Sequence, residues 1–245
     1  MTDTTARVAL VTGGSGGIGK SVVTKLVDDG FAVGVHYAGN KAKADALIEE
    51  VTAVGGDAIA VSGDVADENA MAAAFDAVES AFGGVDVVVN TAGIMVLGPI
   101  AEYDLDQFDQ LVRTNLRGAF VVSQQAARRV RTGGAIINFS TSVTRTRLPR
   151  YGPYVATKAA VEGLTLILAR ELRGRDITVN TVAPGPTATP LLFNSNTEQT
   201  IQALTNATPL ERLGQPEEIA DAVAHLAGPA RWVNGQTVFV NGGLA

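Results

Sequence analysis

Short apolar runs alternate along the chain with longer stretches in which hydrophobic residues recur every three or four positions. The runs are rich in Val, Ile and Ala and carry few charges, which is typical of strands covered on both faces of a parallel sheet. The pattern predicts strands at residues 8–11, 32–36, 58–61, 85–89, 135–139, 177–181 and 237–240.

Helices are predicted between these strands, and several have residues suited to helix ends. Gly30 and Gly55 stand where a helix C-terminus favours positive φ, while Pro216 and the two glutamates after it suit a first turn. The predicted helices are residues 18–28, 42–54, 68–82, 105–131, 154–173 and 216–226. Strands that alternate with helices in this way predict a doubly wound α/β domain with right-handed crossovers.

The least regular segment, residues 183–206, contains three prolines and then a polar run. A loop of that length in a compact domain is commonly functional. No linker rich in Gly, Pro or Ser divides the 245 residues. We therefore predict a single domain over residues 1–245.

Composition excludes several classes of function. The net charge of −6 argues against non-specific binding to nucleic acid. Cysteine is absent and the only histidines are His36 and His225, so neither a thiolate nucleophile nor a Cys/His metal site is expected. The first residues show no signal-peptide pattern, and no apolar stretch is long enough for a membrane span. We expect a cytoplasmic protein without metal, membrane or nucleic-acid partners.

A glycine-rich turn joins the first predicted strand to the first helix, and it reads Thr12-Gly13-Gly14-Ser15-Gly16-Gly17-Ile18-Gly19. Backbone N–H groups at such a helix N-terminus suit a pyrophosphate. Lys20 and Ser21 extend the string to the P-loop pattern of nucleoside triphosphatases. Those enzymes also need an acid after a neighbouring strand to hold Mg²⁺, and Asn90 occupies that place here. The turn alone leaves both phosphate-binding interpretations open.

Tyr154 and Lys158 are four residues apart in a predicted helix, so they share a face at about 6 Å along its axis. An exposed pair at this spacing commonly has no role. A phenol, whose ordinary pKa is about 10, needs help to exchange a proton at neutral pH. A nearby ammonium favours phenolate and so lowers that pKa, which makes the pair a candidate acid–base site.

Six motifs, in order and at matching intervals, resemble the short-chain dehydrogenase/reductase family over essentially the whole chain. They are Thr12-Gly13 through Gly17-Ile18-Gly19, Asn90-Thr91-Ala92-Gly93, Asn115 in Arg113-Thr114-Asn115-Leu116, Tyr154 with Lys158, Pro184-Gly185 with Thr187 and Thr189, and Asn234-Gly235-Gln236 with Val240-Asn241-Gly242-Gly243. The resemblance implies a Rossmann-type sheet of seven parallel strands in the order 3-2-1-4-5-6-7 and a nicotinamide cofactor instead of a P-loop nucleotide. It also implies a homodimer or homotetramer that uses helices 105–131 and 154–173.

The resemblance implies roles for individual residues. Tyr154 would exchange a proton with the substrate oxygen, Lys158 would lower the pKa of Tyr154 and bind the nicotinamide ribose, and Asn115 would hold a relay water. The implied cofactor contacts are Gly13, Ser15, Gly17, Ile18 and Gly19 at the pyrophosphate, Asp64 and Val65 at the adenine, Asn90, Ala92 and Gly93 at the adenosine ribose and phosphates, and Pro184, Gly185, Thr187 and Thr189 at the nicotinamide.

The hydroxyl that binds the substrate carbonyl departs from the family pattern. A serine usually lies thirteen residues before the tyrosine, and that position is Thr141 here. Threonine keeps the hydroxyl donor and adds a methyl group and a stiffer χ1. A shift of one residue in the loop would present Ser142 instead. The spacing favours Thr141 and leaves Ser142 as the alternative.

The segment after the second predicted strand bears on the choice of nicotinamide. NAD enzymes of this fold commonly carry an acid there for the ribose 2′-hydroxyl, and residues 35–43 contain none. His36, Asn40 and Lys41 are candidate contacts for the 2′-phosphate of NADP, although the lysines here also suit the solvated start of a helix. Gly16 replaces an arginine that often assists NADP in the family. We expect NADPH to be preferred over NADH.

The substrate is the feature that the sequence determines least. The resemblance places a mostly apolar set around it, namely Met95, Val96, Leu97, Leu148, Tyr151 and residues 191–193. Arg145, Arg147 and Arg150 are either solvated loop charges or contacts to an anionic group on an acyl carrier. The pattern is similar to the 3-oxoacyl-[acyl-carrier-protein] reductase branch, in which Arg131 and Arg175 would be further carrier contacts. We expect a reductase of a 3-oxoacyl thioester or similar ketone; the alternatives are an alcohol or sugar dehydrogenase and a catalytically silent NADP-binding regulator.

Overall fold

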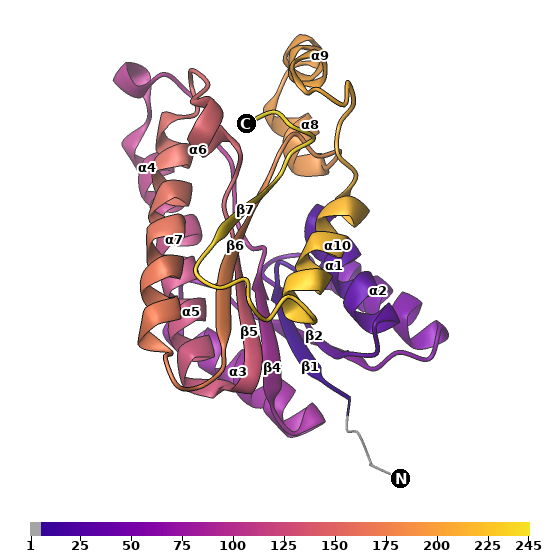
Figure 1. Ribbon diagram of the computed structural model, residues 1–245. Coiled ribbons are helices and arrows are strands. Elements are labelled where there is room, and N and C mark those ends of the chain that lie inside the picture. The colour runs from indigo at the N-terminus through magenta and orange to yellow at the C-terminus, as the bar shows by residue number, and fades with distance from the viewer. Residues whose placement is uncertain (1–5) are drawn as a thin grey trace.

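The computed structural model describes residues 6–245. The first five residues, on which the prediction of no signal peptide partly rests, lie outside the described residues. Its centre is a seven-stranded parallel sheet in the order β3-β2-β1-β4-β5-β6-β7 (Figure 1). The strands are β1 (Val8–Thr12), β2 (Ala32–Tyr37), β3 (Ala58–Ser62), β4 (Val85–Asn90), β5 (Val130–Phe139), β6 (Thr178–Pro184) and β7 (Thr237–Val240). The predicted doubly wound α/β fold and its strand order are confirmed.

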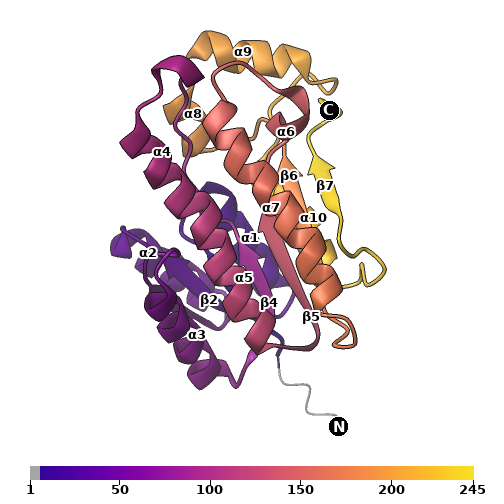
Figure 2. The same ribbon diagram turned by 90° about the vertical axis from the view of Figure 1, so that its left-hand side faces the viewer.

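Helices cover both faces of the sheet (Figures 1 and 2). One face is covered by α1 (Gly17–Asp28), α2 (Lys41–Ala53) and α10 (Pro216–Ala227). The opposite face is covered by α3 (Glu68–Phe82), α5 (Gly118–Arg129) and α7 (Gly152–Glu171). The apolar runs of the strands are therefore buried on both sides, as their composition predicts.

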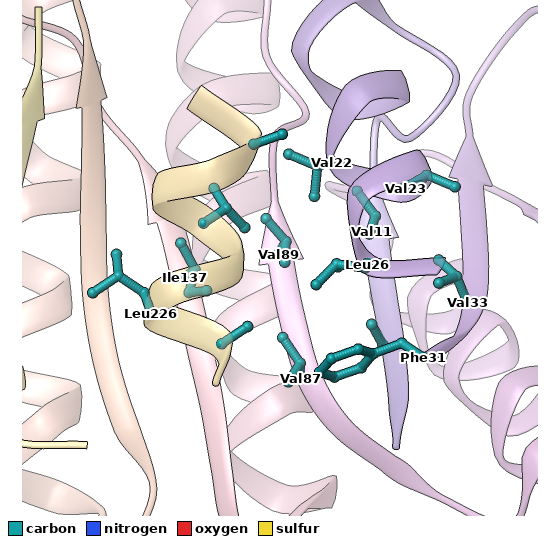
Figure 3. Packing of buried hydrophobic residues seen from close by; sticks show 14 of the residues in the cluster. Val11, Val22, Val23, Leu26, Phe31, Val33, Val87, Val89, Ile137 and Leu226 are labelled. Carbon is teal, nitrogen blue, oxygen red and sulfur yellow. The ribbon is translucent and has the colours of Figure 1, made fainter. Parts of the chain in front are cut away.

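Each face has its own apolar core. Between α1, α10 and the sheet, Leu26 of α1 lies near Val89, and Leu226 of α10 lies near Ile137 (Figure 3). On the other face, Phe75 from α3 is among the largest fully buried side chains. Burying one such side chain stabilises a fold by roughly 1.5–3 kcal/mol. The two cores hold the strands rigidly, and the loops at the strand ends are supported by that frame.

The predicted helix over residues 105–131 is wrong in two respects. It is divided into α4 (Leu105–Val112), the π-helical turn η2 (Arg113–Arg117) and α5. It also ends two residues early, because Val130 adopts extended backbone and pairs with Val85, so that β5 begins there. Arg131, the second residue of β5, donates from its Nε to Asp86 of β4 at 2.8 Å.

The predicted irregular segment 183–206 contains two short helices, α8 (Pro190–Ser195) and α9 (Glu198–Ala207), after β6 has run on to Pro184. Both helices lie above the carboxyl end of the sheet (Figure 1). Two more short elements are η1 (Ile100–Glu102) and α6 (Val143–Thr146). Over residues 6–245, no helix combines the length and the apolar character that crossing a membrane requires.

The predicted helix ends agree with the structure where local chemistry sets them. Gly30 and Gly55 both have φ of +83°, after α1 and α2 respectively. Helix α10 begins at Pro216, and the Glu218 carboxylate accepts a hydrogen bond from the N–H of Gln215 at 2.8 Å. These contacts satisfy backbone groups that helix ends leave free.

Candidate active site

A cleft of about 820 Å³ opens at the carboxyl edge of the sheet, where the loops after β1, β4, β5 and β6 meet. The strand order reverses between β1 and β4, which is where ligands bind in folds of this kind. The predicted site residues that line the cleft are Gly13, Ser15, Gly17, Ile18, Gly19, Ala92, Gly93, Thr141, Ser142, Tyr154, Lys158, Pro184, Gly185, Thr187 and Thr189. The six others, namely His36, Asn40, Asp64, Val65, Asn90 and Asn115, lie behind or beside it.

The glycine turn forms a cradle for an anion. Gly13 has φ of +65°, and a β-carbon on Gly19 would clash with the carbonyl oxygen of Gly13. Among the described residues, no side chain caps the N-terminus of α1, so N–H groups of its first turn remain free for a phosphate at the cleft. Lys20 also lines the cleft, but its ammonium is paired with Glu50 at 2.7 Å. The geometry fits a dinucleotide pyrophosphate better than a P-loop nucleotide.

His36 does not lie where a 2′-phosphate would bind. It is buried at the end of β2, with Nε2 3.0 Å from the carbonyl oxygen of Gly63 and Nδ1 accepting from the N–H of Gly13 at 3.4 Å. Burial lowers the pKa of His36 to about 4, so the ring is neutral at pH 7. Its role here is to brace the glycine turn, which corrects the contact expected from the sequence.

The adenosine end of the cleft is lined by Tyr37, Ala38 and Lys43. Asn40 instead caps α2, since its side chain accepts from the N–H of Lys43 at 3.0 Å. Lys41 pairs with Asp45 at 2.7 Å on the exposed face of the same helix. Of the two lysines at the start of α2, Lys43 lines the cleft, whereas Lys41 has the solvated role that was the alternative.

Asp64 and Val65 stand apart from the cleft. The Asp64 carboxylate accepts from the N–H of Ala66 at 2.9 Å and from Arg113 at 2.7 Å, and both interactions lower its pKa. Val65 is buried against Gly118 of α5. A contact from the Asp64 carboxylate to an adenine amino group would have to compete with Arg113, so the structure does not bring this pair to the site as expected.

Asn90 also has a structural partner. Its Oδ1 accepts from the hydroxyl of Thr12 at 2.6 Å, and this bond ties the end of β4 to the end of β1. Ala92 and Gly93, two and three residues further on, line the cleft. The strand-four motif therefore reaches the site through its last residues.

Tyr154 and Lys158 lie side by side on α7, both almost fully buried. The Lys158 ammonium donates to the carbonyl oxygen of Phe139 at 3.0 Å and lies 5.9 Å from the centre of the Tyr154 ring. Burial lowers the pKa of Lys158 to about 8. Burial also raises the pKa of Tyr154, a hydrogen bond with Thr141 opposing it in part. The lowered phenol pKa expected from the sequence is not found, because desolvation outweighs the hydrogen bond with Thr141.

The two candidate hydroxyls have different partners. Thr141 hydrogen-bonds with Tyr154, and its Oγ1 accepts from the N–H of Val143 at 3.3 Å. Ser142 donates to the carbonyl oxygen of Ala183 at 3.2 Å, and its N–H donates to that of Pro184 at 2.8 Å. Thr141 thus faces the phenol, whereas Ser142 ties the loop after β5 to the end of β6.

Asn115 lies in the π-helical turn η2, and its Nδ2 is 3.3 Å from the hydroxyl of Thr157 on α7. Its side chain accepts from the N–H of Ile94 and donates to the carbonyl oxygen of the same residue, both at 2.9 Å. A β-carbon on Gly93 would lie 3.2 Å from Oδ1 of Asn115 and 3.3 Å from Nζ of Lys158. Glycine at position 93 therefore lets the strand-four loop, Asn115 and Lys158 meet.

The substrate end of the cleft is mostly apolar. Met95, Leu148 and Tyr151 line it together with residues 191 and 192 of α8. The expected residues Val96, Leu97 and Phe193 are not part of its lining. The Tyr151 hydroxyl donates to Oδ1 of Asn196 at 2.9 Å, which holds the end of α8 over the cleft.

The arginines separate into two groups. Arg145 stacks on Phe239 at 5.2 Å, while Arg147 and Arg150 are exposed next to the cleft residues Leu148 and Tyr151.

The other two arginines lie at the amino edge of the sheet, away from the cleft. Arg131 pairs with Asp86, and Arg175 donates to the carbonyl oxygens of Ala127 and Val130. Both were expected as further contacts with an acidic carrier, and that expectation stays a prediction.

The family model described as Enoyl-(Acyl carrier protein) reductase matches residues 13–245. A short-chain type dehydrogenase/reductase of Picea abies is 43% identical over 248 residues, which cover 97% of this chain and 92% of that protein. The chain belongs to the short-chain dehydrogenase/reductase family. The resemblance found in the motifs is confirmed, and with it an oxidoreductase that acts on CH–OH or C=O groups.

Two further relatives of this short-chain dehydrogenase/reductase have informative names. The 3-oxoacyl-[acyl-carrier-protein] reductase FabG of Staphylococcus aureus (strain N315) is 44% identical, over 96% of this chain and 97% of that protein. The crystal structure of a short chain dehydrogenase from Burkholderia cenocepacia J2315 in complex with NADP is 37% identical, with a TM-score of 0.91 over 97% of both chains.

Several residues that line the cleft of this short-chain dehydrogenase/reductase were not predicted from the sequence. Tyr37 is the last residue of β2 and Ala38 directly follows it, so the end of the predicted strand already indicated their place at the carboxyl edge of the sheet. Leu204 of α9 and Leu244 also line the cleft. Nothing local marks these two leucines, because they reach the cleft only through the path of the chain after β6.

Proposed function

We propose that the protein is an NADPH-dependent reductase that converts a ketone, such as a 3-oxoacyl thioester, into a secondary alcohol. The observation that carries the proposal is the buried arrangement of Tyr154, Thr141 and Lys158 at one wall of a dinucleotide-sized cleft. Because burial raises its pKa, Tyr154 keeps its proton at neutral pH. A protonated phenol is the state that can donate to a carbonyl oxygen.

In the proposed reaction, each group of cleft residues would have a separate role. Bound NADPH would supply the hydride, held by the glycine turn at its pyrophosphate and by Thr187 and Thr189 at its nicotinamide. The Thr141 and Tyr154 hydroxyls would bind the carbonyl oxygen, and Tyr154 would give it a proton. The Lys158 ammonium would stabilise the phenolate left behind. A water held by Asn115 would complete proton exchange with solvent.

Preference for NADPH rests on the adenosine end. Lys43 faces that end of the cleft, and residues 35–43 hold no acid that would repel a 2′-phosphate. The NADP complex of the Burkholderia cenocepacia relative supports the same cofactor. We assign the 2′-phosphate contact to Lys43.

The choice of substrate rests on the apolar wall and on its rim. Met95, Leu148 and Tyr151 suit an acyl chain, and the Staphylococcus aureus relative is named for reduction of a carrier-bound 3-oxoacyl group. Arg147 and Arg150 at the rim would attract an acidic carrier. The protein would act in the cytoplasm as a homodimer or homotetramer.

An assay of NADPH consumption tests the proposal against its alternatives. The panel holds 3-oxoacyl thioesters and simple ketones, and a parallel panel offers NADP⁺ with alcohols and sugars. The proposal predicts turnover with 3-oxoacyl thioesters or ketones. Turnover only in the oxidative panel would assign an alcohol or sugar dehydrogenase. Tight NADPH binding without turnover in either panel would assign a regulator.

A further inference from the structure

Glu162 is a partly buried carboxylate near the site that the proposed mechanism leaves without a role. It lies on α7 one helical turn beyond Lys158. Its Oε1 accepts from the hydroxyl of Ser140 at 2.6 Å and from the hydroxyl of Thr144 at 2.9 Å. One oxygen of Glu162 therefore binds two donors of the loop after β5.

These two donors flank Thr141 in the chain. The carbonyl oxygen of Thr141 accepts from the N–H of Thr144 at 3.2 Å. The Thr144 hydroxyl, whose single proton is shared between this carbonyl and Glu162, lies 2.9 Å from the same oxygen. Ser140, which precedes Thr141, is buried, and its hydroxyl also lies 3.4 Å from the carbonyl oxygen of Lys158. Glu162 consequently fastens both sides of Thr141 to the helix that carries Tyr154.

The hydrogen bonds to Glu162 are strong enough to fix the position of the residues around Thr141. Hydroxyl groups that donate to a carboxylate form short bonds, about twice as strong as bonds between neutral groups. Thr141 and Tyr154 come from different elements, a loop and a helix, and a carbonyl oxygen must lie within hydrogen-bond distance of both hydroxyls. An error of about 1 Å in such an arrangement can cost up to about 100-fold in rate.

We propose that Glu162 is a positioning residue, which holds the Thr141 hydroxyl in register with the Tyr154 hydroxyl through Ser140 and Thr144. The expected effect of Glu162 on the reaction rate rests on the proposed function. The contacts of Glu162 do not depend on it.

The first test compares three variants at saturating NADPH. Glu162→Ala removes the acceptor and is expected to lower kcat about 10-fold, with the Kd of NADPH changed by less than about twofold. Glu162→Gln keeps an acceptor oxygen and is expected to restore most of kcat. Glu171→Ala, which removes an exposed carboxylate at the other end of α7, serves as the matched control and is expected to match wild type. An unchanged kcat in Glu162→Ala would overturn the proposal.

The second test separates positioning from general stability. Thr141→Ala is introduced into wild type and into Glu162→Ala, and the loss of kcat is expected to be several-fold smaller in the second background. Equal losses in both backgrounds would contradict the proposal. If Glu162→Ala fails to fold, the double variant Ser140→Ala/Thr144→Val removes the same two hydrogen bonds and is expected to reproduce the loss of kcat.

A third measurement is independent of turnover. Val143 and Thr144 donate their amide hydrogens to Thr141, so exchange of these two hydrogens is expected to accelerate in Glu162→Ala but not in Glu162→Gln or Glu171→Ala. Accelerated exchange in a protein that reduces no carbonyl would retain the role of Glu162 and reject the proposed function. Turnover with unchanged exchange would reject the role of Glu162 alone.

Discussion

Tyr154 and Lys158 are both almost fully buried, and burial favours the neutral form of each. A neutral phenol is a proton donor, whereas a lysine with a pKa of about 8 still carries its charge at neutral pH. In the proposed reaction the pair is therefore set for reduction near pH 7, with Tyr154 protonated and the charge of Lys158 in place.

The pKa of Lys158 predicts the alkaline limb of activity. As pH rises through about 8, Lys158 loses the charge that stabilises the Tyr154 phenolate, so kcat/KM for ketone reduction is expected to fall while Tyr154 is still protonated. The pH profile of kcat/KM measures this directly. Lys158→Met is expected to be slow at all pH values and to lack that limb. A wild-type profile that stays flat to pH 10 would contradict the assignment.

The two lysines of α2 give a matched pair for cofactor selection. Lys43→Ala is expected to raise the Kd of NADPH about 10-fold and to leave that of NADH unchanged, because it removes a charge that faces the 2′-phosphate site. Lys41→Ala is the control, since Lys41 pairs with Asp45 outside the cleft. Fluorescence titration gives both constants. An equal effect on NADPH and NADH would place the 2′-phosphate elsewhere.

Spacing within one helix made Tyr154 and Lys158 predictable, because four residues bring two side chains to the same face. The adenine contact predicted for Asp64 is not found, and no local pattern could have shown this, because its partner Arg113 is 49 residues away. Thr141 and Ser142 were likewise inseparable by spacing, and the partners of their hydroxyls, Tyr154 and Ala183, distinguish them.

At the scale of elements, the site depends on how the strand ends are tied together. His36 at the end of β2 connects the turn after β1 to Gly63 after β3. The hydroxyl of Thr12 connects β1 to Asn90 of β4. These bonds connect the carboxyl ends of β1, β2, β3 and β4, and they keep the glycine turn in place.

The buried ring of His36 makes stability depend on pH. Its pKa is about 4 in the folded chain and about 6.5 when unfolded, so the unfolded state binds more protons between these values. The stabilisation is complete above pH 6.5 and is lost as pH falls, by about 2–3 kcal/mol at pH 4.5. Urea unfolding is expected to show this loss in wild type and its absence in His36→Gln. Equal losses in the two proteins would contradict it.

Strand positions were predicted well because both faces of the sheet are covered and each strand reads as an apolar run. The start of β5 was missed, since Val130 and Arg131 continue the helical pattern of the preceding residues although Val130 already pairs with Val85. Helices α8 and α9 were missed because prolines and polar residues hide short helices that their contacts with the rest of the fold support.

At the scale of the molecule, one sheet connects all strands, and we propose that residues 1–245 form one domain. Helices α5 and α7 run side by side on one face of the molecule (Figure 2). Phe120, Leu166 and Ile167 expose about half of their surface there, at 52%, 41% and 51%. An apolar face of this kind is typical of an interface between subunits.

Light scattering tests the predicted assembly. Wild type is expected at two or four times 25.3 kDa. Ile167→Glu is expected to lower the mass, because a charge would be buried in the interface. Val54→Glu changes an equally apolar, exposed residue at the end of α2 and is expected to leave the mass unchanged. A wild-type mass of 25.3 kDa would contradict the prediction.

Replacement of Tyr154 by Phe tests the central claim most directly, because it deletes one oxygen and leaves the ring. We expect kcat for ketone reduction to fall by about 100- to 10,000-fold, with the Kd of NADPH changed by less than about threefold. Tyr103→Phe, whose lost hydroxyl binds the carbonyl oxygen of Val96, is expected to retain activity. A Tyr154→Phe variant that reduces ketones at the wild-type rate would contradict the account.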